Sequence, residues 1–108
     1  MERKVEPNYT MIFINESINL YTSEKVKNEI IQLMERESNK NIVINLNKVP
    51  YIDSSGLLVL NTIQKKSQLS NKLLYLFDLD ERIHSALQLA GLKSLLGMII
   101  SQEDLLKL

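Results

Sequence analysis

The sequence predicts an α/β fold in a single domain, residues 1–108, because short β-type apolar segments alternate with longer segments of helical periodicity. The length suits one domain, and an apolar content of 44% is sufficient for a buried core. The alternation favours a largely parallel sheet of four or five strands, since each parallel pair needs a crossover that a helix can supply.

The first half of the chain predicts two strands and two helices, and it leaves room for another strand before Pro7. Apolar β-type residues mark strands at 9–14 and 41–46, and the run Ile42-Val43-Ile44 indicates burial on both faces of the sheet. Helical spacing follows each strand, first from an expected N-cap at Thr22 to about residue 36 and then over about 54–69.

The second half predicts two further strand and helix pairs. They are a strand at 73–77, a helix after Asp80, a short strand at 96–100 and a helix that begins after Ser101. Gly91 is a natural end for the helix before it, because glycine adopts the left-handed conformation at little cost. Asp104 stands three residues after Ser101, as in a capping box.

Composition excludes several classes of function. Thirteen Lys and Arg balance thirteen Asp and Glu, and a formal net charge of zero argues against binding of nucleic acid or anionic membranes. The chain has no cysteine and one histidine, His84, for which we expect a surface or core-edge role; cysteine-based and histidine-rich metal sites are therefore excluded. We expect no cofactor and no enzyme activity, because no nucleophile–base pair or glycine-rich phosphate loop is recognisable.

The start of the chain is charged and lacks the apolar core of a signal peptide. No apolar run approaches the roughly 20 residues that a membrane helix needs. We therefore expect a cytoplasmic protein that does not bind membranes.

Asp53-Ser54-Ser55-Gly56 opens the helix that follows the central strand, where functional groups of open α/β sheets gather. Asp53 can cap this helix, and a phosphate on either serine would meet free backbone N–H groups and the positive end of the helix dipole. Gly56 would leave the backbone open to another protein. Plain capping explains the same residues, so the motif alone does not decide its function.

The segment Pro50-Tyr51-Ile52-Asp53-Ser54-Ser55-Gly56-Leu57 resembles the signature of STAS domains, in particular that of the anti-anti-sigma factors, or anti-sigma factor antagonists. The match is specific over residues 41–60, and order and spacing extend it over about 9–108. The resemblance implies a STAS-like fold, with a four- or five-stranded mixed sheet and about four helices in the order βαβαβαβα.

The resemblance also implies a protein-binding switch. Such antagonists bind an anti-sigma factor that is a GHKL-type serine kinase, and so release the sigma factor. The kinase phosphorylates the first serine after the aspartate, here Ser54, which ends binding until a PP2C-type phosphatase removes the phosphate. The implied partner-binding residues are Asp53, Ser54, Ser55, Gly56 and Asn19, in a monomer or weak dimer.

One position departs from the family pattern. Many members carry Gly-Glu-Leu/Ile-Asp before the first helix, whereas this chain has Glu16-Ser17-Ile18-Asn19, so that Asn19 stands without charge where an acid is expected. This departure supports an alternative, in which the chain is a non-switching STAS subunit, an accessory or scaffold protein of a signalling or lipid-transport complex. Ser54 is then only part of a helix start.

Overall fold

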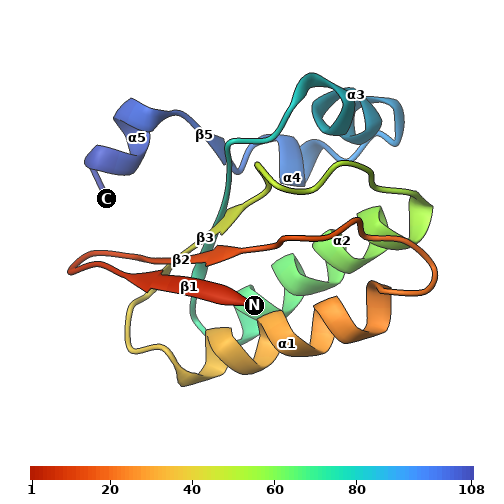
Figure 1. The fold of residues 1–108 in the computed structure, drawn as a ribbon. Helices are drawn as coiled ribbons and strands as arrows, with labels where there is room; N and C mark the ends of the chain where they lie inside the picture. Colours follow the sequence, from red (N-terminus) through yellow and green to blue (C-terminus); the bar gives the residue numbers. More distant parts are fainter.

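The computed structural model describes all residues, 1–108, as a five-stranded mixed sheet with helices on both faces (Figure 1). The strands, in spatial order, are β1 (Glu2–Val5), β2 (Thr10–Phe13), β3 (Asn41–Asn45), β4 (Leu73–Phe77) and β5 (Ile99–Ile100). β1 pairs antiparallel with β2, and the other neighbours are parallel. The strand before Pro7 is thus part of the sheet, and the expected mixed α/β fold is confirmed.

Five helices connect or follow the strands, where the resemblance implied about four. They are α1 (Ser23–Arg36), α2 (Ser54–Leu69), α3 (Glu81–Leu89), α4 (Lys93–Leu96) and α5 (Gln102–Leu106). No helix is both long and apolar enough to cross a membrane.

The expected strand at 96–100 is wrong over its first half. The backbone N–H of Leu96 donates to the carbonyl of Leu92 at 3.1 Å, so Leu96 ends the helical turn α4. Gly97 and Met98 form a turn, and Ile99–Ile100 pair with β4. The helical turn α4 buries Leu95 completely in the core. A short apolar run fits a strand or a buried helix equally well by periodicity, and here tertiary packing selects the helix.

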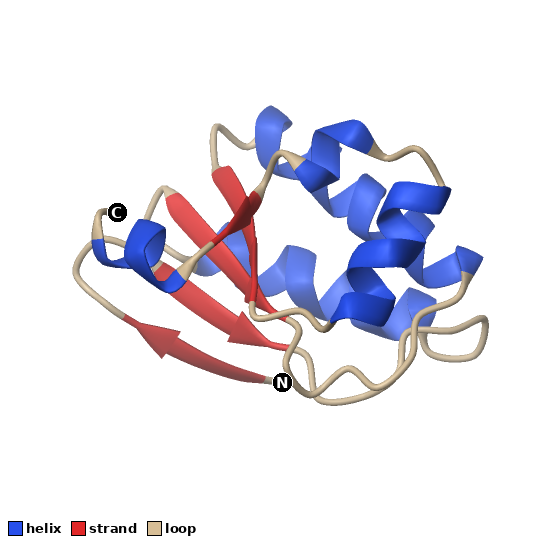
Figure 2. Cartoon of the chain, turned by 90° about the horizontal axis from the view of Figure 1, so that it is seen from above, coloured by secondary structure: helices blue, strands red, loops and turns tan.

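The strand order places most helices on one side of the sheet (Figure 2). Because parallel crossovers are right-handed, consecutive crossovers between sequential neighbours put α1 and α2 on the same face. The main core fills this face, with Ile44, Ile30 and Leu60 fully buried, and α3 and α4 add Ile83 and Leu95 to it.

The opposite face is covered only by α5. Leu105 of this helix is buried against Met11 and Val43. All residues of β3 except Asn41 are buried, which confirms the burial predicted for this strand.

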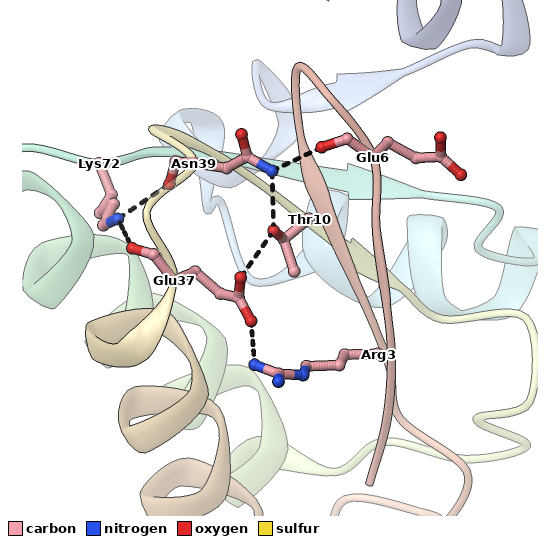
Figure 3. Close-up of polar contacts among 6 residues, drawn as sticks. All are labelled: Arg3, Glu6, Thr10, Glu37, Asn39 and Lys72. Carbon is pink, nitrogen blue, oxygen red and sulfur yellow. Dashed lines mark hydrogen bonds and ion pairs between the residues drawn. The ribbon is translucent and has the colours of Figure 1, made fainter.

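A polar network holds the amino ends of the strands together (Figure 3). The buried carboxylate of Glu37 pairs with Arg3 of β1 and accepts a hydrogen bond from the hydroxyl of Thr10 at 3.2 Å. Lys72 donates to the backbone carbonyls of Glu37 and Asn39, the latter at 2.8 Å. The network gives buried polar groups their partners and fastens β1 to the rest of the fold.

Candidate functional site

Asp53 closes the first turn of α2, as the sequence predicts. Its Oδ1 accepts a hydrogen bond from the backbone N–H of Gly56 at 3.1 Å. Its Oδ2 accepts from the N–H of Leu20 at 3.3 Å, and its own N–H donates to the carbonyl of Ile18 at 3.2 Å. One carboxylate therefore holds both the helix start and the loop before α1, which run side by side in Figure 1.

The two serines occupy the first two positions of α2 but differ in surroundings. Ser54 is exposed, whereas Ser55 is half-buried. Ser54 lines a groove whose other residues come from α2 and from the segment after α3, namely Leu57, Leu58, Asn61, Ala90 and Leu92. Ser55 lines a separate groove between α1 and α2. Another protein can therefore reach the hydroxyl of Ser54 more readily than that of Ser55.

Gly56 has a different role from the one the sequence suggested. It is buried, and a Cβ atom on it would lie 2.5 Å from the carbonyl oxygen of Ile18 and closer still to Cγ1 of Ile52. Ile18 and Ile52 themselves form an isolated parallel bridge. The missing side chain lets α2 approach this bridge, so the expectation that Gly56 exposes its backbone to a partner is wrong.

Asn19 builds the turn that leads into α1. Its Oδ1 accepts hydrogen bonds from the backbone N–H groups of Tyr21 at 2.9 Å and Thr22 at 3.1 Å. Thr22 lies at the N-cap position, but its hydroxyl donates to the carbonyl of Ser17 at 2.8 Å and forms no cap bond to α1. The predicted side-chain cap is therefore wrong, because the hydroxyl serves the turn before the helix.

The implied site residues thus lie together. The N–H of Leu20 joins the Asn19 turn to Asp53 at the start of α2, and Asp53 is followed directly by the two serines. No group of three or more His, Cys, Asp and Glu side chains is arranged to hold a metal ion, and His84 is half-buried on α3. The arrangement offers an exposed serine at a helix start that Asp53 caps.

Three apolar side chains around the start of α2 are exposed, which the sequence pattern does not reveal. They are Leu20, Tyr21 and Leu58, which are 70%, 92% and 64% exposed. Leu58 lies within 54–69, where the sequence predicts a helix, and Leu20 and Tyr21 lie in the connection between the strand at 9–14 and the helix after Thr22. The adjacent pair Leu20-Tyr21 in that connection is the sequence feature that could have indicated an exposed apolar surface.

Comparison with known proteins places this geometry in a family. The family model of the STAS domain matches residues 1–104. The anti-sigma-B factor antagonist of Staphylococcus aureus is 27% identical over 97 residues, which cover 89% of this chain and 88% of that protein. The protein of the same name from Staphylococcus epidermidis is 32% identical over 80 residues, covering 73% of this chain and 72% of the relative.

Solved structures agree in fold. The anti-sigma factor antagonist SpoIIAA in its unphosphorylated form has a TM-score of 0.74 at 14% identity, covering 97% of this chain and 91% of SpoIIAA. The phosphorylated form of SpoIIAA from Bacillus has a TM-score of 0.66 at 16% identity, covering 98% and 96%. The chain therefore belongs to the STAS domain family, among the anti-sigma factor antagonists, which are regulatory binding proteins and not enzymes.

Proposed function

We propose that this chain binds an anti-sigma factor and that phosphorylation of Ser54 ends the binding. In its unphosphorylated form it occupies an anti-sigma factor that is a GHKL-type serine kinase, which frees the sigma factor. The kinase phosphorylates Ser54, and a PP2C-type phosphatase reverses the reaction. The names of the Staphylococcus relatives and the existence of a phosphorylated form of SpoIIAA support this proposal.

The accessibility of Ser54 is the observation that carries the proposal. Its side chain is exposed at the first residue of α2, whereas Ser55 is half-buried between α1 and α2. A kinase active site can therefore accept Ser54 without unfolding the helix. A phosphate there meets the free N–H groups and positive dipole of the helix start, so the phosphorylated chain stays folded.

The phosphate acts on the interface through its charge. It adds about −1.5 to −2 charges at neutral pH, directly beside the carboxylate of Asp53. Inside a protein contact this charge loses its water without gaining a counter-charge, at a cost of several kcal/mol. Because each 1.4 kcal/mol changes affinity about tenfold, a micromolar complex dissociates.

Phosphorylation in vitro tests the site. The chain is incubated with ATP and the anti-sigma factor kinase encoded in the same genome, and the products are mapped by mass spectrometry. We expect one phosphate on Ser54, its loss in Ser54→Ala, and its retention in the matched variant Ser55→Ala. Ser54→Asp should abolish kinase binding without lowering thermal stability. Phosphate on another residue, or none at all, would refute the proposal.

The scaffold alternative is favoured by one observation at Asn19. The side-chain oxygen of Asn19 is used inside its own turn and carries no charge for a partner. If the chain is a non-switching subunit of a larger complex, Ser54→Ala should leave its regulatory effect in cells unchanged. A switch predicts instead that Ser54→Ala keeps the sigma factor constantly active, because the antagonist can no longer be released.

A further inference from the structure

Leu20, Tyr21 and Leu58 form an exposed surface, here called the apolar patch, beside the proposed phosphorylation site. Tyr21 is 92% exposed, and the other two are more than half exposed. Leu20 and Leu58 line the same groove between α1 and α2, and Leu58 also lines the groove that contains Ser54. The patch is therefore continuous with the surface around Ser54, whereas single exposed apolar residues are ordinary.

The backbone under the patch is held in place by several hydrogen bonds. The N–H of Tyr21 donates to Oδ1 of Asn19 at 2.9 Å, and the N–H of Leu20 donates to Asp53 at 3.3 Å. The N–H of Asn19 donates to the hydroxyl of Thr22 at 3.0 Å. A side chain displayed on a fixed turn loses little backbone entropy when it is bound, which suits Leu20 and Tyr21 as anchors.

The charged side chains of α1 nearest to the patch form ion pairs within the chain. Lys27 lies 3.0 Å from Glu24, and Lys25 lies 3.0 Å from Glu16. The carboxylate of Asp53 accepts two backbone hydrogen bonds, as described above. Asp53, beside Ser54, keeps its negative charge, because neutral N–H groups do not neutralise a carboxylate. A charged partner group placed against Leu20 and Tyr21, in contrast, would lose its water beside apolar side chains and paired residues of α1, which is unfavourable. Complementarity therefore calls for an uncharged, apolar partner surface.

We propose that the anti-sigma factor receives Tyr21 and Leu20 in an uncharged apolar pocket, adjacent to its surface that faces Ser54. This inference rests on the proposed function and specifies the chemistry of the partner at this one turn. Tyrosines buried at the centre of an interface are frequent hot spots. Binding at the apolar patch should therefore depend strongly on the side chain of Tyr21 and only weakly on salt.

Calorimetric titration with the anti-sigma factor kinase of the same genome tests the inference. The affinity is measured at about 50 mM and about 500 mM NaCl, which differ strongly in charge screening. We expect Tyr21→Ala to weaken binding about tenfold or more at both salt concentrations. The control Leu106→Ala removes a leucine that is 78% exposed on α5, on the other face of the sheet, and should leave affinity unchanged.

Asn19→Asp decides between an apolar and a cationic partner surface. A carboxylate can accept the same bonds from Tyr21 and Thr22, so the turn is retained, which thermal denaturation verifies. We expect weaker binding, because the new charge faces an uncharged pocket. If Asn19→Asp binds more tightly and the gain is lost at high salt, the partner presents a cation here. That result, or an unchanged affinity of Tyr21→Ala, would overturn this inference but not the proposed function. Failure of the wild-type chain to bind would overturn the proposed function and this inference together.

Discussion

Replacing Gly56 by alanine should destabilise the whole fold, although alanine is the better helix former. The added Cβ would lie 2.5 Å from the carbonyl oxygen of Ile18, and it would overlap the side chain of Ile52. That carbonyl cannot move away freely, because it accepts the hydrogen bond from the N–H of Asp53. Relief of the clash must therefore shift α2 away from the bridge between Ile18 and Ile52, at the start of the proposed switch helix.

The expected loss of stability in Gly56→Ala follows from opposing contributions. Overpacking of a buried site costs typically about 1–3 kcal/mol, and a weakened hydrogen bond at Ile18 adds about 1 kcal/mol. Better helix propensity returns about 1 kcal/mol at most. The free energy of unfolding should thus fall by about 2 kcal/mol, which lowers the melting temperature of a domain of this size by roughly 8 °C.

Urea denaturation followed by circular dichroism measures this change. The matched control is Gly97→Ala, whose added Cβ would have no neighbour closer than 3.5 Å. The control should stay within about 0.5 kcal/mol of the wild-type chain. If Gly56→Ala is as stable as the control, the close approach of α2 to Ile18 does not require a glycine, and the argument from internal packing is wrong.

Two further predictions concern the C-terminal helix. Hydrogen bonds from the N–H and hydroxyl of Ser101 lower the pKa of Asp104. These bonds therefore stabilise the fold fully above the ordinary aspartate pKa of about 3.9, and the stabilisation is lost as the pH falls through the lowered pKa. Asp104→Asn should therefore flatten the decrease of the urea midpoint between about pH 6 and about pH 2.5, and an unchanged pH profile would contradict this. Leu105→Ala, which uncovers Met11 and Val43, should cost about 2 kcal/mol, whereas exposed Leu106→Ala should cost less than about 0.5 kcal/mol. Equal effects of the two leucine variants in urea denaturation would show that α5 does not cover the sheet.

The sequence by itself determined those features that depend on residues close together in the chain. Ile42-Val43-Ile44 forms a buried strand, and Asp53 and Asp80 accept cap bonds from residues three positions later. Ser101 and Asp104 form the predicted capping box, and Gly91 has the left-handed φ of 69° at the end of α3. Periodicity and capping act over one or two turns, so the alternation of strands and helices follows from them.

Tertiary structure alone decided the features that depend on contacts across the chain. Burial of Leu95 goes with the helical turn α4, which takes Leu96 from the start of an expected strand, and the approach of α2 to Ile18 turns Gly56 into a packing residue. The same packing leaves Ser54 exposed and half-buries Ser55, although the two are neighbours with identical side chains. Accessibility depends on which distant segments cover a residue, and local patterns carry no record of those segments. The family resemblance implied Ser54 as the switch residue, and only the fold shows that this serine is more exposed than Ser55.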